Sequence, residues 1–136
     1  MKAKNLAVLG LQWGDEGKGK IVNFLSDRAD AACRYQGGHN AGHTLIVDGK
    51  KLVLHLLPSS ICHQNASSLI GRGVVVSCEA LFAEIEEIEP IANGILDRLK
   101  ISPACTLIQP YHIVLDLSLI HISEPTRPLY ISYAVF

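Results

Sequence analysis

The first third of the chain changes between continuous and periodic apolar patterns. Residues 5–11 form an apolar run that ends at a glycine-rich turn, which is typical of a strand buried on both faces. Residues 18–29 have apolar side chains at positions 21, 22, 24 and 25, a spacing that favours a helix with one buried face. Residues 31–35 form a second short apolar stretch. The order of strand, glycine loop, helix and strand predicts a β-α-β unit and therefore an α/β fold.

A pair of β-prone runs follows, at residues 44–47 and 51–57. Between them stands Asp48-Gly49, and Asp-Gly at such a position is a strong signal for a β-hairpin because glycine accepts a positive φ. Residues 68–76 read as a further strand, interrupted by two glycines. The middle of the chain therefore predicts a hairpin followed by another sheet strand.

A helix is predicted over residues 78–89, with Ser77 as its N-cap and five glutamates on its exposed side. Pro90 and Gly94 are expected to mark its end. Residues 95–101 and 105–108 are short apolar pieces, and another element begins at residue 111. The expected fold is therefore α/β, a mostly parallel sheet with flanking helices and a hairpin.

Composition limits the class of protein. The chain has 136 residues, enough for about one domain. Its net charge of −1 suggests binding neither to nucleic acid nor to a membrane surface. The apolar start is too short for a signal peptide or a membrane span. The four cysteines have no C-x-x-C spacing, which favours reduced thiols in a cytoplasmic protein over a zinc site.

The segment Gly14-Asp15-Glu16-Gly17-Lys18-Gly19-Lys20 has the spacing of a phosphate-binding loop, but Ile21 stands where Ser or Thr would hold magnesium. Glycine-loop amides at a helix N-terminus bind anions, and Lys18 and Lys20 add positive charge. The two acids inside the loop would repel a phosphate. Asp15 could replace the missing magnesium ligand or act as a general base on a second substrate. The alternative is a solvent-facing acid favoured by the helix dipole.

A second glycine-rich motif covers residues 36–43 and ends in His39-Asn40-Ala41-Gly42-His43. Its histidines are four residues apart, but the glycines argue against a helix and no third ligand is near, so a zinc site is rejected. A histidine in such a loop can approach a phosphate as an acid or hydrogen-bond donor. A purely structural, hydrogen-bonded histidine is the alternative. Loops that follow successive strands of an open parallel sheet face one crevice, which favours a shared site.

The strings GLQWGDEGKGKIV and RYQGGHNAGHT together resemble the N-terminal region of the adenylosuccinate synthetase family. HLLPSSI, IGRGVVVSCEAL and PYHIVLD are also similar to that family. The resemblance runs from about residue 4 to residue 116. It implies an incomplete P-loop-like GTP-binding domain in a homodimeric cytoplasmic enzyme of AMP biosynthesis. Such a ligase joins L-aspartate to IMP with GTP and Mg²⁺, through a 6-phosphoryl intermediate.

The resemblance also implies residue roles. Asp15 would be the base that takes the N1 proton of IMP, and His43 the acid that stabilises phosphoryl transfer. Mg²⁺ would be held by Asp15 and the carbonyl of Gly42. GTP would touch residues 14–20 and 42–44, and IMP residues 15–18 and 40–43. The nucleotide-binding set is then Gly14, Asp15, Glu16, Gly17, Lys18, Gly19, Lys20, Asn40, Ala41, Gly42, His43 and Thr44.

The end of the chain carries a different resemblance. Residues 117–136 resemble the translation of a sequencing-library adapter, so residues 1–116 are interpreted as the N-terminal part of the catalytic domain and residues 117–136 as a non-native tail. A chain that covers about a quarter of such an enzyme is expected to be inactive and poorly stable alone. Two alternatives stay open: a generic P-loop nucleotide-binding protein and a non-catalytic nucleotide-binding fragment. Ile21 counts against the first.

Overall fold

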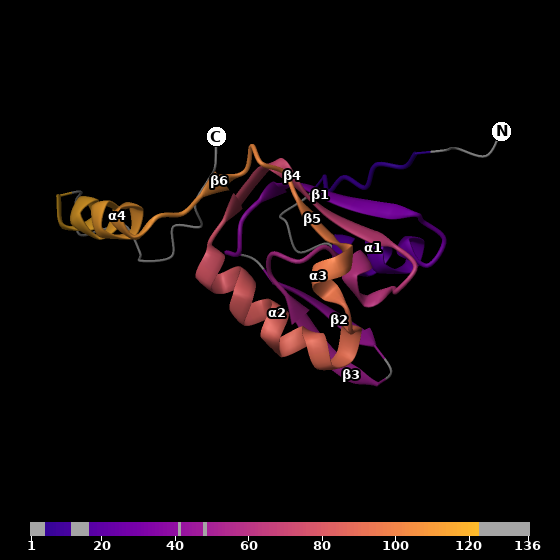
Figure 1. Ribbon diagram of the computed structural model, residues 1–136. Coiled ribbons are helices and arrows are strands. Elements are labelled where there is room, and N and C mark those ends of the chain that lie inside the picture. The colour runs from indigo at the N-terminus through magenta and orange to yellow at the C-terminus, as the bar shows by residue number, and fades with distance from the viewer. Residues whose placement is uncertain (1–4, 12–16, 41, 48, 123–136) are drawn as a thin grey trace.

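The computed structural model describes residues 5–11, 17–40, 42–47 and 49–122, with side chains described up to residue 116. Helices and strands are interspersed along the chain, as is typical of an α/β fold (Figure 1). The elements in order are α1 (Lys18–Ser26), β1 (Ala31–Gly37), β2 (His43–Val47), β3 (Lys50–Leu54), the 3₁₀ helix η1 (Ser59–Cys62), β4 (Ser67–Val76), α2 (Cys78–Ala92), α3 (Ile95–Arg98), β5 (Leu99–Ile101), β6 (Thr106–Leu107) and α4 (Pro110–Ile122).

The larger sheet is built around β4. β1 and β5 pair with it in parallel in the order β1-β4-β5, and β6 pairs with the end of β4 through Val75 and Val76. The β1–β4 register shifts between Arg34 and Gln36, next to the two glycines of β4. A Cβ at Gly73 would lie 2.5 Å from the Tyr35 carbonyl oxygen, so β1 can approach there only because this position is glycine. The predicted α/β class with a mostly parallel sheet is confirmed.

The predicted hairpin is also confirmed. β2 and β3 pair antiparallel from His43 opposite Leu54 to Val47 opposite Lys50. Gly49 has φ +77°, the left-handed conformation that the Asp-Gly signal requires, while Asp48 lies outside the described residues. The hairpin buries Leu45, Leu52 and Leu54.

The helix α2 begins as predicted, because the Ser77 hydroxyl accepts the N–H of Ala80 at 3.3 Å. It ends later than predicted: Pro90 lies inside the last turn, and the Asn93 N–H still bonds to the Glu89 carbonyl beyond it. The expectation of five exposed glutamates is wrong at Glu84, which is 6% exposed. Its carboxylate bonds to backbone amides of another segment, and that pairing allows its burial.

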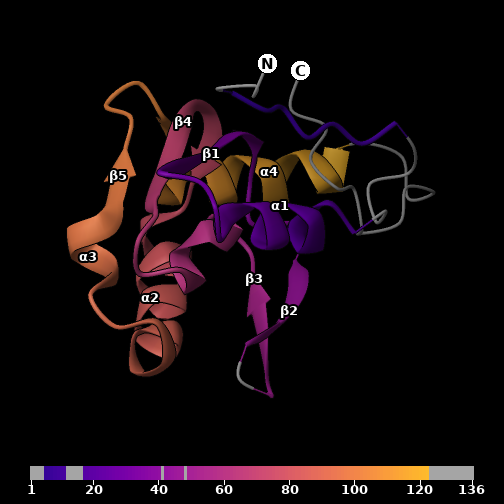
Figure 2. The same cartoon turned by 90° about the vertical axis from the view of Figure 1, so that its right-hand side faces the viewer.

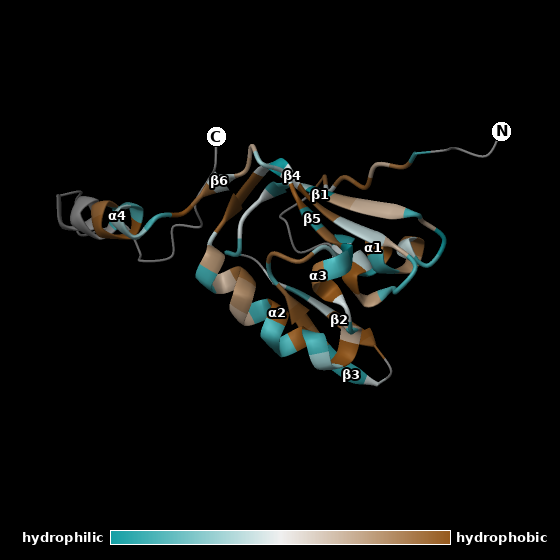
Figure 3. Ribbon diagram, viewed as in Figure 1, coloured by the Kyte–Doolittle hydropathy of each residue, from teal (hydrophilic) through white to brown (hydrophobic). Residues whose placement is uncertain are grey.

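The core lies between the larger sheet, α2 and the segment that follows the hairpin. Its members are aliphatic side chains: Leu45, Leu54, Leu56, Leu57, Ile61, Ile70, Val74, Val76, Leu81, Ile85, Ile88, Ala92 and Ile95. In two perpendicular views, α1, α2 and the hairpin lie on the same side of the sheet (Figures 1 and 2). The hydrophobic colouring of β3 and of the inner side of α2 follows this arrangement (Figure 3).

The first predicted strand is wrong in this structure. Residues 5–11 have no regular secondary structure and run along the outside, with Leu6, Leu9 and Leu11 between 65% and 93% exposed (Figure 3). The predicted buried face of α1 is wrong for a related reason, since Ile21 and Phe24 are exposed. An apolar run becomes a buried strand only where a neighbouring strand and covering layers exist. Within the described residues, this segment has neither.

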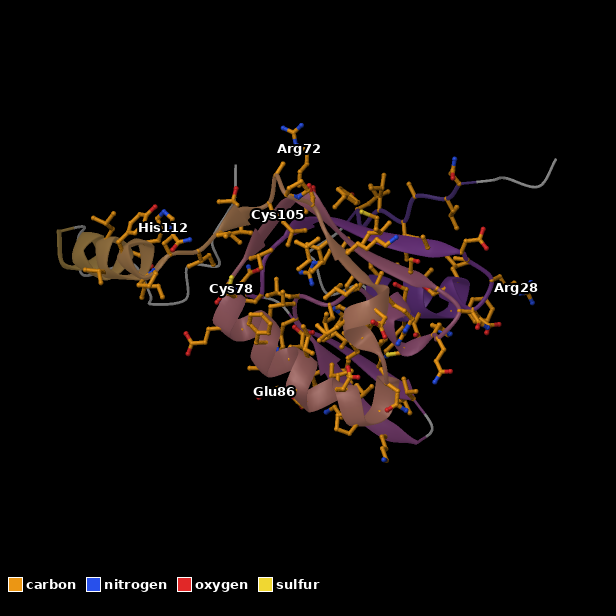
Figure 4. The ribbon with its side chains drawn as sticks, viewed as in Figure 1. Arg28, Arg72, Cys78, Glu86, Cys105 and His112 are labelled. Carbon is orange, nitrogen blue, oxygen red and sulfur yellow. The ribbon has the colours of Figure 1, made fainter. Side chains whose placement is uncertain are left out.

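The remaining predictions concern the cysteines, membrane spans and the end of the chain. All four cysteines are free, with Cys78 at the start of α2 and Cys105 beside β4 (Figure 4). No helix in the described part of the chain is long and apolar enough to cross a membrane. Residues 117–122 continue α4, and residues 123–136 lie outside the described part. The boundary of the non-native tail at residue 116 therefore stays a prediction.

Candidate functional site

The first motif leads into α1 through a left-handed glycine. Gly17 has φ +85° and precedes the helix, and the N–H of Lys20 donates to its carbonyl at 3.0 Å. Lys18 and Lys20 therefore lie in the first turn, where the helix dipole favours an anion. Gly14, Asp15 and Glu16 lie outside the described residues. That this loop binds phosphate, and that Asp15 acts in it, stays a prediction.

The two motifs meet where α1 passes the start of β2. A Cβ at Gly19 would lie 2.5 Å from Cδ2 and 2.8 Å from Cγ of the His43 ring. Distances below 3.0 Å are closer than side chains pack, so the imidazole occupies the space that a side chain at Gly19 would need. The end of the second motif thus lies directly against the helix that follows the glycine loop.

His43 is held by a hydroxyl on its other side. Ser59, at the start of η1 and only 4% exposed, places its Oγ 3.0 Å from Nε2 of His43. Burial, together with the positive charge of Arg34 and the neighbouring His55, lowers the pKa of His43 to about 4. The imidazole is therefore neutral at pH 7. In that form one ring nitrogen donates a hydrogen bond and the other accepts one.

The loop between β1 and β2 is fixed by Arg34 of β1. Its guanidinium donates to the carbonyl of Gly38 at 2.7 Å and to the carbonyl of His55. Burial lowers the pKa of Arg34, and the charge of Glu84 raises it. His55 also lies close to Gly42, where a Cβ would be 2.8 Å from its Cε1. Arg34 therefore links Gly38 to His55, and the ring of His55 lies against Gly42.

The middle of the second motif faces a different space. Residues 36–40 line an open cavity of about 1220 Å³ between the end of β1, the start of α2, β6 and α4. His39 and Asn40 of the motif share this cavity with Glu79 of α2 and with His112 of α4, which stands apart from the sheet (Figure 4). The motif thus contributes to two places: Asn40 to the cavity, and His43 to the contact with α1.

The structure brings together only part of the predicted set. Gly19 and His43 are in contact, Gly42 lies against His55, and Asn40 lines the cavity. Thr44 is opposite Val53 in the hairpin ladder. Ala41 lies outside the described residues, as the acids of the first loop do.

Four residues at this site were missed by sequence reasoning: Arg34, His55, Ser59 and Glu84. Arg34, His55 and Glu84 stand inside stretches that predict an ordinary strand or helix, so no local pattern singles them out. Ser59 follows a proline just after the predicted hairpin, and the only signal there is the resemblance of HLLPSSI to the family. Among the described residues, no group of three or more potential ligands could hold a metal ion. The predicted magnesium pair, Asp15 and Gly42, stays a prediction.

Comparison with known proteins agrees with the motifs. The family model described as adenylosuccinate synthetase matches residues 7–122. The adenylosuccinate synthetase of Stutzerimonas stutzeri is 61% identical over 113 residues, which are 83% of this chain and 65% of that relative. The enzyme of the same name from Azotobacter vinelandii is also 61% identical, over 83% of this chain and 26% of the relative.

Solved structures agree as well. A fully ligated adenylosuccinate synthetase from Plasmodium falciparum matches 84% of this chain with a TM-score of 0.73 and 43% identity. A cyanophage S-2L succinoaminodeoxyadenylate synthetase shares the fold, with a TM-score of 0.61 at 23% identity. The chain spans 26% of the Plasmodium protein and 30% of the phage protein. With most of its residues matched by the family model, the chain belongs to the adenylosuccinate synthetase family.

Proposed function

We propose that this chain supplies part of the IMP and GTP site of a ligase that joins L-aspartate to IMP. The products are adenylosuccinate, GDP and phosphate, in AMP biosynthesis. The observation that carries the proposal is the contact between Gly19 and His43, because it puts the ends of two family motifs in one place. Phosphoryl transfer depends mainly on positioning and charge neutralisation, which two converging glycine-rich segments can provide.

The proposed chemistry has two steps. Asp15 takes the N1 proton of IMP, and the O6 atom attacks the γ-phosphate of GTP to give 6-phosphoryl-IMP and GDP. The amino group of L-aspartate then attacks C6, and phosphate leaves. The amides and lysines of residues 14–20 would hold the phosphates of GTP, and Asn40 would contact IMP.

His43 would stabilise the transferring phosphoryl group by hydrogen bonding. Its neutral form at pH 7 can do so through a ring N–H. A phosphate beside the ring would raise the pKa of His43, because an anion stabilises the imidazolium form. Arg34 and His55 oppose that rise. A histidine that is neutral without phosphate and takes up a proton more readily when phosphate binds can then donate that proton in a hydrogen bond to the phosphoryl group, which suits this role.

Magnesium, a homodimeric assembly and a cytoplasmic location belong to the same proposal. Asp15 and the Gly42 carbonyl would hold Mg²⁺, since carboxylate and carbonyl oxygens are the ligands that this hard cation takes. The ion would supply neutralisation of phosphate charge. With these ligands, Ile21 need not hold the metal.

A chimera tests the proposal. Residues 4–116 of this chain replace the matching segment of the Azotobacter vinelandii enzyme, and formation of adenylosuccinate and GDP is measured. The chimera is expected to be active, and its Asp15→Asn variant to lose IMP-dependent GTP turnover by at least about 10²-fold while it still binds GTP. The 136-residue chain, expected to be inactive alone, is assayed beside it.

The same assay separates the alternatives. A generic P-loop protein would hydrolyse GTP without IMP, and a non-catalytic nucleotide-binding protein would bind GTP without turnover. Full IMP-dependent turnover by the Asp15→Asn chimera would remove the assignment of Asp15 as the base. An inactive unmodified chimera would remove the proposed function.

A further inference from the structure

A buried carboxylate in α2 bonds to the segment that follows the hairpin. Glu84 is 6% exposed and lies among the aliphatic side chains of the core. It accepts the backbone N–H groups of His55 at 2.8 Å, Leu56 at 2.7 Å and Leu57 at 3.2 Å. A buried carboxylate is costly unless it is hydrogen-bonded, and here three amides bond to it. The geometry of residues 55–57 therefore depends on this one side chain.

Residues 55–59 form a support segment that connects Glu84 to the second motif. The carbonyl of His55 accepts a hydrogen bond from Arg34, which also bonds to the Gly38 carbonyl. The ring of His55 lies against Gly42. Ser59, at the end of the segment, reaches Nε2 of His43. The segment that Glu84 anchors is thus linked to Gly38 through Arg34, lies against Gly42 and contacts His43, the last residue of the motif.

We propose that Glu84 is a positioning residue: it fixes the support segment so that the Ser59 hydroxyl holds the imidazole of His43 in one orientation. The catalytic consequence rests on the proposed function, whereas the orientation of His43 does not. A carboxylate suits this task because both its oxygens accept and neither donates. Glutamine at position 84 would keep the size but present an NH₂ group to backbone N–H donors.

The competing interpretation is that Glu84 only stabilises the core. The two interpretations differ in whether the effect passes through Ser59. If it does, removing the Ser59 hydroxyl first removes the contact through which Glu84 acts on His43, and the two substitutions are not additive. If Glu84 acts only on stability, its effect on activity remains in the absence of the hydroxyl.

The first experiment follows His43 by NMR in the 136-residue chain with ¹⁵N-labelled histidine. The Glu84→Gln and Ser59→Ala variants are both expected to change the His43 ring shifts, because the imidazole loses its fixed orientation. The matched control is Glu86→Gln, an exposed glutamate on the same helix (Figure 4), which is expected to leave His43 unchanged. If Glu84→Gln folds too poorly for NMR, Glu84→Asp takes its place. Unchanged His43 signals in either Glu84 variant would overturn the proposal.

The second experiment uses the active chimera. Glu84→Gln and Ser59→Ala are each expected to lower kcat about tenfold or more, with KM for GTP changed less than threefold, because displacing a group at the reacting phosphate costs transition-state binding. The double variant is expected to match Ser59→Ala alone. Additive losses would overturn the proposal. An inactive unmodified chimera would reject the proposed function and leave the NMR experiment to decide the positioning role.

Discussion

The contact between Gly19 and His43 makes the substitution Gly19→Ala a test in which two physical effects have opposite signs. In a helix, alanine is favoured over glycine by about 1 kcal/mol, so propensity alone predicts a more stable protein. A Cβ at this position would lie 2.5 Å, 2.8 Å and 2.9 Å from Cδ2, Cγ and Cβ of His43. These are ring and proximal atoms of a side chain that Ser59 also holds, so they cannot simply swing aside.

Overpacking of this kind costs about 1–3 kcal/mol. Set against the gain of about 1 kcal/mol from propensity, the net expectation is a loss of stability of up to about 2 kcal/mol and a displaced imidazole. The assay is urea unfolding of the 136-residue chain, with the His43 ring shifts measured on the same samples.

The matched control is Gly17→Ala. Gly17 has φ +85° and nothing within 4 Å of the added Cβ, so alanine there costs about 1 kcal/mol through backbone strain. It is expected to leave the His43 signals in place. A Gly19→Ala protein that is more stable than the original, with unmoved His43 signals, would refute the contact between the two motifs.

Two further predictions concern stability. Because the pKa of His43 falls from 6.5 to about 4, the unfolded chain binds more protons between those pH values, and stability is lost as pH falls from 6.5 to 4. The expected loss in the free energy of unfolding, reduced because His43 is partly exposed, is about 1–2 kcal/mol. Urea midpoints measured across this pH range should show the loss. The same pH dependence in a His43→Gln variant would contradict the prediction. Arg98→Met should lower the free energy of unfolding by about 2–3 kcal/mol in the same assay. The Arg98 guanidinium donates to four backbone carbonyls, those of Ile61, His63, Ala92 and Asn93. The control is Arg72→Met, which should change the free energy of unfolding by about zero because Arg72 is exposed (Figure 4). Equal losses from the two arginine variants would contradict that role.

Local chemistry explains which elements could be predicted from the sequence. The Asp-Gly turn, the Ser77 cap and the strand over residues 68–76 each depend on neighbours a few residues away, and each is confirmed. The apolar run at 5–11 carries the same local signal, but a strand also needs a partner, and that is a property of distant residues. Whether Ile21 and Phe24 are covered depends on distant residues in the same way.

The candidate site could likewise be predicted only in part from the sequence. Gly19 and His43 could be named because glycine loops and histidines have recognisable chemistry, although their contact could not be read from spacing. Glu84 was assigned to the exposed side because helical glutamates usually are exposed. Glu84 is buried instead because its carboxylate bonds to backbone amides almost thirty residues earlier in the chain. A hydrogen bond between residues so far apart in the chain cannot be predicted from the local pattern of apolar and polar residues.

The dependence of residues 55–57 on Glu84 also has a consequence in time. The ribosome makes His43 about forty residues before it makes Glu84, which at 5–20 residues per second is a delay of about 2–8 s. During that interval residues 55–57 lack the carboxylate that later bonds to their backbone amides. The second motif is therefore synthesised before the residue on which its final shape depends.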